Sequence, residues 1–301
     1  MLPFARVTII GLGLIGSSIA RAVKANMPTV RITGFDADAD VRTIARKIGL
    51  CDDITDLPGT AVIDADLVII CVPVGAIEAA AESFVDDLPA DVIISDVGGS
   101  KASALAAMTA ALPNHIIIPA HPVAGTEFSG PEAGFATLFR NRWCILTPPE
   151  WADATSIARV RTFWERLGSN VEQMDAAHHD LVLAVTSHIP HLIAYTIVGT
   201  ASDLEAVTQS EVIKYSAGGF RDFTRIAASD PTMWRDVFLN NKEAVLEILQ
   251  RFTEDLTGLQ RAIRIGDGQA LFDHFTRTRA VRRSVIAEGQ DDSKPDFGRD
   301  H

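Results

Sequence analysis

The sequence predicts an α/β protein in which a doubly wound parallel sheet is followed by an all-helical part. In the first half, short runs rich in β-branched residues alternate with helical stretches, and this alternation is typical of βαβ units. Most of these runs are continuously apolar, as expected for parallel strands buried on both faces. The expected strands are Val7–Ile10, Arg31–Phe35, Leu67–Cys71, Val92–Ser95, Ile116–Pro119, Trp143–Leu146 and Asn170–Gln173.

After Asp175 the pattern contains no further strand. A long helix is expected over Ala176–Ala201, with Asp175 as its N-cap and a kink at Pro190. Further helices are expected over Asp203–Tyr215, Phe220–Ala228, Thr232–Leu259 and Ala270–Ala287. We therefore predict one domain over residues 1–174, a helical domain over 175–287 and a disordered, polar tail over 288–301.

Length and charge limit the classes of function. The chain has 301 residues, which suits two domains of roughly 100–200 residues each. Its formal net charge of −12 argues against binding to nucleic acid or to an anionic membrane. A small anionic substrate is still compatible with this charge, because a single Arg or Lys can hold it inside an acidic protein.

Cysteine usage and hydropathy indicate the compartment. The 3 cysteines lack the CxxC or CxxH spacing of a zinc site, so we expect no metal and a reducing cytosol. A strand begins almost at once, near Arg6, which leaves no room for a signal peptide. The longest uncharged apolar run, Leu67–Ile77, is too short to span a bilayer, which needs about 20 residues. We therefore predict a cytoplasmic protein without a membrane segment.

A glycine motif follows the first expected strand. The run Gly11-Leu12-Gly13-Leu14-Ile15-Gly16 lies between Val7–Ile10 and a helical stretch, and Asp36 ends the next strand. This context is that of a Rossmann-type dinucleotide site, in which the glycines allow the pyrophosphate to approach the helix N-terminus. An acid at Asp36 binds ribose hydroxyls and repels a 2′-phosphate, which favours NAD, although the nearby Arg42 leaves NADP open.

Ligands of open α/β sheets bind outside the carboxyl ends of the strands, so the loops there supply further candidates. Asp96-Val97-Gly98-Gly99-Ser100-Lys101 is either a helix cap alone, with Ser100 heading the helix, or a cap and a site together. The candidate cofactor-binding residues are Gly11, Gly13, Leu14, Ile15, Gly16, Asp36, Val72, Pro73, Asp96 and Gly98.

His121 follows an apolar strand, where a core histidine has no evident reason to be. A histidine with a pKa near neutrality can take a hydroxyl proton while hydride leaves the same carbon. We therefore predict that His121 is a catalytic base, the alternative being a structural histidine.

The expected helix from Ala176 is apolar but carries a polar stripe. Asp180, Ser187 and His191 lie within roughly 20° of one line at 100° per residue, with His188 beside them. The stripe predicts a helix that faces a polar cavity, or else a set of satisfied interior polar groups. Further along, Arg221 and Arg225 share a helical face and could bind a carboxylate or pair with nearby aspartates.

Four segments taken together resemble the prephenate/arogenate (cyclohexadienyl) dehydrogenase family of tyrosine biosynthesis. They are GLGLIGSSIA, HPVAGTEFSGPEAG, TSHIPHL and GGFRDFTRIAASDPTMWRD, and the resemblance extends to about Ala287. It implies a dinucleotide-binding domain, a helical substrate and dimerisation domain, and a homodimer. It also implies NAD-dependent oxidative decarboxylation of prephenate, of arogenate or of both.

The resemblance implies roles for individual residues. It assigns His121 to the substrate hydroxyl, Arg225 to a substrate carboxylate, and His191 to a second site histidine. Trp234, Glu127, Ser187 and His188 are implied near the substrate. In many members the loop after the fifth strand carries a serine that partners the catalytic histidine, whereas this chain has Gly99 there and Ser100 one residue later. Ser100 reaches the histidine by a loop shift, or water replaces it.

The chemistry is coherent without the family name. Prephenate carries a carboxylate para to a ring carbinol, so its oxidation needs a nicotinamide, a base and a cation, and needs no metal. The alternative enzyme is a β-hydroxyacid dehydrogenase or imine reductase, for which Lys214 is the candidate catalytic lysine. A non-catalytic NAD-sensing module is disfavoured by the presence of both His121 and Arg225.

Overall fold

The computed structural model describes residues 2–126, 128–208 and 218–287. Glu127, Lys214, the end of the helix expected over Asp203–Tyr215 and the expected tail over 288–301 lie outside the described residues. Contacts divide the chain into two compact units, Met1–Val245 and Leu246–His301. The boundary that we predicted near Asp175 stays a prediction.

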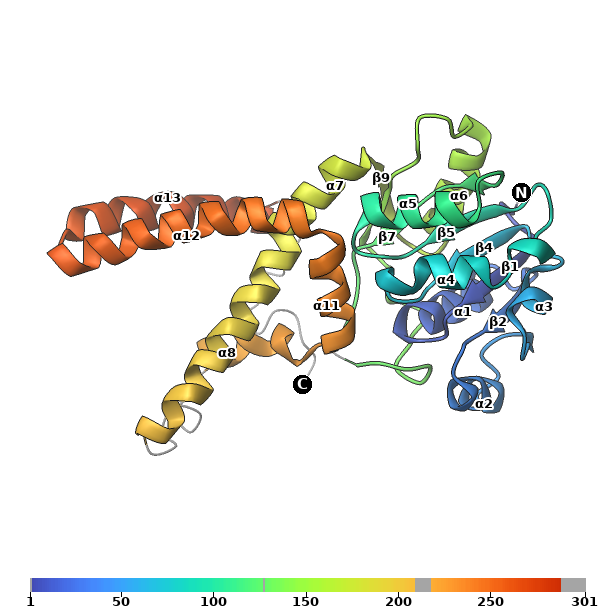
Figure 1. Cartoon of the computed structure of the whole chain (residues 1–301), viewed down its shortest axis with the longest axis horizontal. Coiled ribbons are helices and arrows are strands. Elements are labelled where there is room, and N and C mark those ends of the chain that lie inside the picture. The colour runs from blue at the N-terminus through green and yellow to red at the C-terminus, as the bar shows by residue number, and fades with distance from the viewer. Residues whose placement is uncertain (1, 127, 209–217, 288–301) are drawn as a thin grey trace. The chain divides into compact units, whose positions relative to one another are not determined.

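A six-stranded parallel sheet forms the centre of the first unit (Figure 1). Its strand order, β3-β2-β1-β4-β5-β6, places later strands on both sides of β1 and confirms the predicted doubly wound fold. The sequence did not reveal β3, a two-residue edge strand that pairs only with β2. The strands are β1 (Arg6–Ile10), β2 (Arg31–Phe35), β3 (Asp53–Ile54), β4 (Leu67–Ile70), β5 (Ile93–Asp96) and β6 (Ile116–Ile117).

Helices cover both faces of this sheet, and neighbouring residues of one strand enter different cores. Ile9 packs into one apolar cluster and Ile10 into another, and both are buried. This explains why the strands read as continuous apolar runs. The helices are α1 (Leu14–Asn26), α2 (Ala39–Lys47), α3 (Pro58–Val62), α4 (Ile77–Glu82), α5 (Lys101–Ala111) and α6 (Ala154–Arg166), with short 3₁₀ turns η1 (Val74–Ala76) and η2 (Val85–Asp87).

A second, three-stranded sheet corrects part of the sequence reading. The run expected over Ile116–Pro119 ends in the large sheet at Ile117, and the chain then starts β7 (Ala120–Pro122) in a new sheet. β8 (Trp143–Leu146) pairs antiparallel with β7 and parallel with β9 (Asn170–Gln173). His121 therefore lies within a strand opposite Ile145, and not in a loop beyond one.

The helical part begins as the sequence predicts. Asp175 caps α7 (Ala176–Leu183) by accepting hydrogen bonds from the backbone of Ala177 and His178. The helix then widens into a π-turn, η3 (Ala184–His188), directly before α8 (Ile189–Thr208). This irregularity lies one turn before Pro190, which lacks the N–H that a regular helix would use there.

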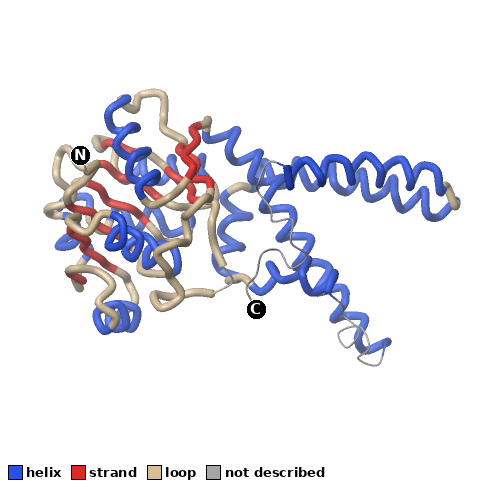
Figure 2. The backbone as a smooth tube through the Cα atoms, turned by 180° about the vertical axis from the view of Figure 1, so that it is seen from behind, coloured by secondary structure: helices blue, strands red, loops and turns tan. Residues whose placement is uncertain are grey.

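The bounds of the remaining helices differ from those that the sequence suggested. The helix expected over Thr232–Leu259 is divided at Asn241 into α11 (Pro231–Asn240) and α12 (Lys242–Ile265). Before them lie α10 (Gly218–Thr224) and the 3₁₀ turn η4 (Arg225–Ala228). The last helix, α13 (Gly268–Ala287), follows a turn at Gly266, whose φ of 72° suits glycine. α12 and α13 run side by side as a helical hairpin (Figures 1 and 2).

Candidate active site

The glycine loop between β1 and α1 has the geometry of a phosphate-binding turn. Gly11 has a φ of 98°, and a Cβ there would lie 2.7 Å from the carbonyl oxygen of Cys71. A Cβ on Gly16 would lie 2.0 Å from the carbonyl oxygen of Gly11, so these two glycines are required by packing. Gly13 has open space around its Cβ position, and no side chain caps α1, which begins at Leu14 and Ile15. The helix N-terminus is thus accessible to an anion.

Asp36 follows β2, and its carboxylate is held in place by hydrogen bonds from backbone N–H groups, one of them in the glycine loop. Its Oδ2 accepts the N–H of Leu12 at 2.7 Å, and its Oδ1 accepts the N–H of Asp38 at 2.9 Å. Arg42 does not extend towards a ligand phosphate, because its Nη1 donates to the carbonyls of Asp36 and Ala37 and its Nε to Asp56. This arrangement suits a ribose with a free 2′-hydroxyl better than one with a 2′-phosphate.

The loop after β4 lies beside the glycine loop, and the loop after β5 packs at Gly98 against Val74. Val72 contacts the position where a Gly11 Cβ would be, and Pro73 is exposed just beyond it. Asp96 is fully buried, accepting the Gly98 N–H and forming an ion pair with Lys101, while its Oδ1 has no protein partner among the described residues. Lys101, also fully buried, donates to the Ala120 carbonyl at 2.7 Å.

Ser100 precedes α5, but its hydroxyl does not cap that helix. Its nearest hydrogen-bond partner is the Val237 carbonyl at 3.5 Å. The backbone position that faces the His121 ring is Gly99, where a Cβ would lie 3.8 Å from His121 Nε2. The loop shift considered for Ser100 is therefore not seen, although its catalytic role stays a prediction.

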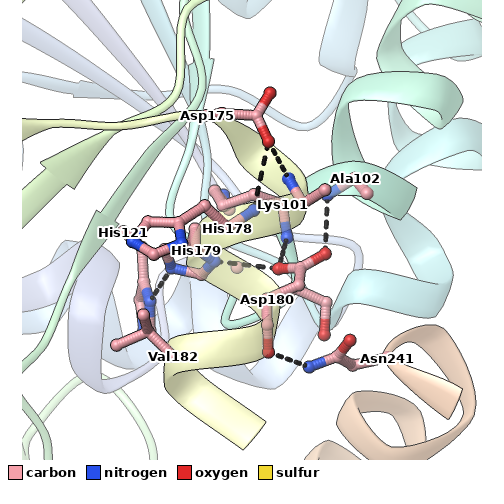
Figure 3. A network of polar contacts seen from close by, with 12 residues as sticks. Lys101, Ala102, His121, Asp175, His178, His179, Asp180, Val182 and Asn241 are labelled. Atoms are coloured by element: carbon pink, nitrogen blue, oxygen red, sulfur yellow. Dashed lines mark hydrogen bonds and ion pairs between the residues drawn. The ribbon is translucent and has the colours of Figure 1, made fainter. Parts of the chain in front are cut away.

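His121 belongs to a hydrogen-bonded chain of side chains (Figure 3). Its Nδ1 lies 2.9 Å from His179 Nε2, and His179 Nδ1 lies 2.8 Å from Asp180 Oδ1. The Asp180 carboxylate also accepts the backbone N–H groups of Lys101 and Ala102, at 2.7 and 2.9 Å. Asp180 is thus the residue that caps α5, from a helix about eighty positions further along the chain.

The surroundings keep His121 and His179 in their neutral form. Burial lowers the pKa of His121 well below the usual 6.5, and the nearby His179 and Lys101 lower it further. Burial also lowers the pKa of His179, and the hydrogen bond to Asp180 offsets this only in part. Burial alone would raise the pKa of Asp180, but its hydrogen bonds outweigh that effect and keep the carboxyl ionised. A neutral His121 is the form that can accept a proton.

A second cluster surrounds Trp234 on α11. The His191 ring stacks on the indole at a centroid distance of 3.6 Å, and the His188 ring meets it edge-on at 6.0 Å. His191 Nδ1 is held by the Ser187 carbonyl at 2.8 Å. Trp234 is 7% exposed, and its Nε1 has no partner among the described residues.

Arg225 lies close to this second cluster. Burial lowers the pKa of His191, and the positive charge of Arg225 lowers it further, although the Ser187 carbonyl acts in the opposite direction. Arg221 instead extends into solvent, with its side chain 78% exposed and its Nε 3.6 Å from Asp222. The structure thus separates the two arginines that share a helical face in the sequence.

His179 is the site residue that the sequence reading missed. Asp180 drew notice as part of the polar stripe, and the adjacent His178-His179-Asp180 run was the available signal. The hydrogen bond between His179 on α7 and His121 on β7 places His179 in the site, and no local sequence pattern predicts this contact. Among the described residues there is no group of His, Cys, Asp and Glu side chains with the arrangement of a metal site.

Comparison with known proteins agrees with this geometry. Residues 19–173 match the nucleotide-binding domain of prephenate dehydrogenase, and residues 175–277 match its dimerization domain. The chain belongs to the prephenate dehydrogenase family. It is thereby placed among the oxidoreductases, and the family assignment inferred from the four motifs is confirmed.

Individual relatives of this prephenate dehydrogenase family member cover nearly its whole length. A cyclohexadienyl dehydrogenase of Zymomonas mobilis is 46% identical over 95% of this chain and 97% of its own. A prephenate dehydrogenase of Bacillus subtilis is 34% identical over 90% of this chain and 74% of its own. A crystal structure of prephenate dehydrogenase from A. aeolicus, in complex with hydroxyphenyl propionate and NAD+, superposes with a TM-score of 0.87 at 31% identity, covering 95% of this chain and 98% of that one.

Proposed function

We propose that this protein catalyses the NAD-dependent oxidative decarboxylation of prephenate, of arogenate or of both. The observation that carries the proposal is His121, a neutral histidine whose Nε2 edge faces Gly99, a residue without a side chain in the loop after β5. The relatives named as cyclohexadienyl and prephenate dehydrogenases support it. The alternative of a β-hydroxyacid dehydrogenase or imine reductase has no comparable support, and its candidate Lys214 lies outside the described residues.

Different residues of this protein serve proton transfer and binding of the substrate anion. When bound, NAD accepts the hydride that leaves the C4 carbon of the substrate. His121 Nε2 takes the proton of the C4 hydroxyl, and Arg225 binds a substrate carboxylate by charge-assisted hydrogen bonds. Loss of CO2 leaves its bonding electrons in the ring, which becomes aromatic. The phenolate oxygen then takes back the proton from His121, so that no net proton is consumed.

The preference for NAD over NADP follows from the end of β2. The Asp36 carboxylate occupies the ribose position expected for this fold, and Arg42 is bound to Asp36, Ala37 and Asp56. A 2′-phosphate would meet a carboxylate without a free arginine beside it. The fit of the glycine loop and of Asp36 supports NAD as the cofactor, as in the complex of the A. aeolicus relative.

Steady-state kinetics with prephenate and arogenate, each with NAD and NADP, tests the proposed function. We expect turnover of at least one of the two ring substrates, with a higher kcat/KM for NAD. A panel of 3-hydroxyacids provides the matched negative control. Turnover of a 3-hydroxyacid, with neither prephenate nor arogenate oxidised, would overturn the proposal in favour of the β-hydroxyacid dehydrogenase alternative.

We also propose that the protein is a cytoplasmic homodimer joined through its helical part. The helical stretch Ala176–Leu204 is long and apolar enough to cross a membrane, which corrects the expectation that no run in the sequence is long enough. It nevertheless buries polar groups such as the Asp180 carboxylate against α5. Along α8, Ile197 and Val198 remain exposed in the single chain. A homodimer interface covers such a surface, and the match to a dimerization domain supports this.

Sedimentation measures this association. We expect the wild-type protein to sediment as a dimer at micromolar concentration and Ile197→Lys to weaken the dimer. Leu57→Lys is the matched control, because Leu57 is an exposed apolar residue that precedes α3, far along the chain from the helical part. A wild-type monomer at micromolar concentration would contradict the proposal.

A further inference from the structure

We propose that His179 and Asp180 are positioning residues that hold His121 in the single tautomer able to accept a proton at Nε2. The proposal rests on the proposed function of His121 and deepens it. Neither His179 nor Asp180 is placed to act on substrate itself: His179 is fully buried, and both Asp180 oxygens are occupied by protein donors. They act through the ring of His121 (Figure 3).

The tautomer of each ring follows from its partner, starting at the carboxylate. Asp180 Oδ1 can only accept, so the His179 Nδ1 that lies 2.8 Å away carries a hydrogen. A neutral His179 then has an unprotonated Nε2, which must accept from His121 Nδ1 at 2.9 Å. His121 therefore carries its hydrogen on Nδ1, which leaves the lone pair of Nε2 directed away from the chain of hydrogen bonds.

Asp180 is itself prevented from turning. Its two carboxylate oxygens accept the N–H groups of Lys101 and Ala102 at the start of α5, in addition to the His179 ring. The positive end of a helix dipole stabilises a carboxylate in this position. On the other side, the Asp180 carbonyl accepts a hydrogen bond from Asn241 at 2.8 Å. Asp180 is the start of the hydrogen-bonded relay Asp180–His179–His121, and it is thus fixed both by α5 and by Asn241, which lies between α11 and α12.

The opposite edge of His121 is where a reacting hydroxyl can approach. Gly99 presents no side chain to Nε2, and a Cβ there would already lie within 3.8 Å of it. A ring in the other tautomer would direct an N–H into this space, and an N–H cannot take a proton. His179 and Asp180 therefore determine whether His121 Nε2 can accept a proton. They lie on α7, in the helical part, whereas His121 lies on β7.

A purely structural reading is that Asp180 serves only to cap α5, with His179 filling space. The two readings differ for His179 variants, which leave the cap intact. His179→Phe keeps a ring but removes the acceptor for His121 Nδ1. His179→Gln restores an acceptor oxygen close to the position of Nε2. His178→Gln is the matched control, because His178 is exposed on the same helix and contributes only backbone contacts to the cap.

We expect His179→Phe to lower kcat by about 10²–10⁴-fold, the usual range for general-base assistance, with little change in KM or in NAD binding. His179→Gln should recover part of that loss, and His178→Gln should match wild type. Asp180→Asn should also lower kcat, because an amide N–H facing His179 Nδ1 favours the wrong tautomer, as in a carboxylate-supported protease histidine. Equal kcat for wild type and His179→Phe would overturn the relay.

Two comparisons make the result unambiguous. If His121→Asn retains near-normal kcat, the proposed function of His121 fails; if His121→Asn loses activity while His179→Phe does not, only the relay fails.

NMR of the wild-type protein with ¹⁵N-labelled histidine avoids any folding defect. We expect both His121 and His179 to be protonated on Nδ1 at neutral pH, which is the less common tautomer in water. Finding His121 protonated on Nε2 would overturn the proposal.

Discussion

Two histidine clusters lie along the same run of helix, and they differ in how completely the protein satisfies them. Around His179 on α7, the ring nitrogens and the Asp180 oxygens all have protein partners. Around His191 on α8, one ring nitrogen binds a backbone carbonyl and the ring stacks on Trp234, whose indole N–H has no partner among the described residues.

This difference supports the proposed division of roles, in which one cluster accepts a proton and the other binds a ligand. A fully hydrogen-bonded chain fixes one protonation state before substrate arrives, and preorganisation of this kind costs nothing at the moment of reaction. A buried donor without a partner is costly unless a ligand satisfies it. We therefore propose proton transfer for the His121 cluster and substrate binding for the cluster of His191, Trp234 and Arg225, and mutations can test the two assignments separately.

The largest effect is expected for His121→Asn. Asparagine keeps part of the shape but cannot take a proton, so kcat should fall by about 10²–10⁴-fold while NAD still binds. In the proposed function the neutral ring is the active form. Because the pKa of His121 lies well below 6.5, kcat/KM should be level at neutral pH and fall only in more acidic solution. His191→Asn is the rival variant. If it removes this acid limb and His121→Asn does not, the base is His191.

Arg225→Ala tests the binding cluster. A charge-assisted pair with a carboxylate is worth about 1.5–3 kcal/mol, so KM for prephenate should rise about tenfold to a hundredfold with NAD binding nearly unchanged. Arg221→Ala is the control, because its side chain is largely exposed beside Asp222. The assignment is wrong if Arg221→Ala raises KM in this way and Arg225→Ala does not.

The sequence predicted features that have a recognisable local pattern and missed those that depend on packing alone. The glycine loop, Asp36 and the Asp175 cap each have such a pattern. The Asp175 cap joins neighbouring residues, whereas Asp36 accepts the Leu12 N–H and Gly11 packs against Cys71. β8 was expected as a strand, but its pairing with β7 in a separate sheet is set by distant contacts.

The errors at Ser100 and Asn241 have the same physical origin. Serine before a helix usually caps it, but here Asp180 occupies the α5 N-terminus from another helix. Helical periodicity continues through Asn241, but its side chain binds the Asp180 carbonyl and approaches His188 Nδ1, and the helix breaks there. Neither contact has a signature in the adjoining sequence.

A smaller effect is expected at the cofactor end, where Asp36→Ser removes the carboxylate that favours NAD. Losing hydrogen bonds to one charged group costs about 1.5–3 kcal/mol, so kcat/KM for NAD should fall roughly tenfold or more and the preference should move towards NADP. Leu12 also loses an acceptor for its N–H, so both nucleotides should bind somewhat less tightly. A wild-type enzyme with the higher kcat/KM for NADP would contradict the assignment.

The smallest effect concerns His188, which connects the two clusters through Asn241. The Asn241 amide donates to the Asp180 carbonyl at 2.8 Å, which fixes its orientation and makes it a donor towards His188 Nδ1 at 3.1 Å. His188 Nδ1 must therefore accept, and protonation would place an N–H against an N–H. Burial is the main reason that the pKa of His188 falls from 6.5 to about 4.

The sign of the resulting pH dependence follows from linkage. Because the unfolded chain binds this proton near pH 6.5 and the folded chain only near pH 4, stability contributed by neutral His188 is complete above 6.5 and is lost as the pH falls to 4. Tm should therefore decline over this interval by several degrees.

His188→Asn keeps an acceptor for Asn241 but cannot titrate, so its Tm should be lower at neutral pH and decline less. His178→Asn, on the exposed face of α7, should decline as wild type does. An equal decline in wild type and His188→Asn would show that other groups control the acid sensitivity.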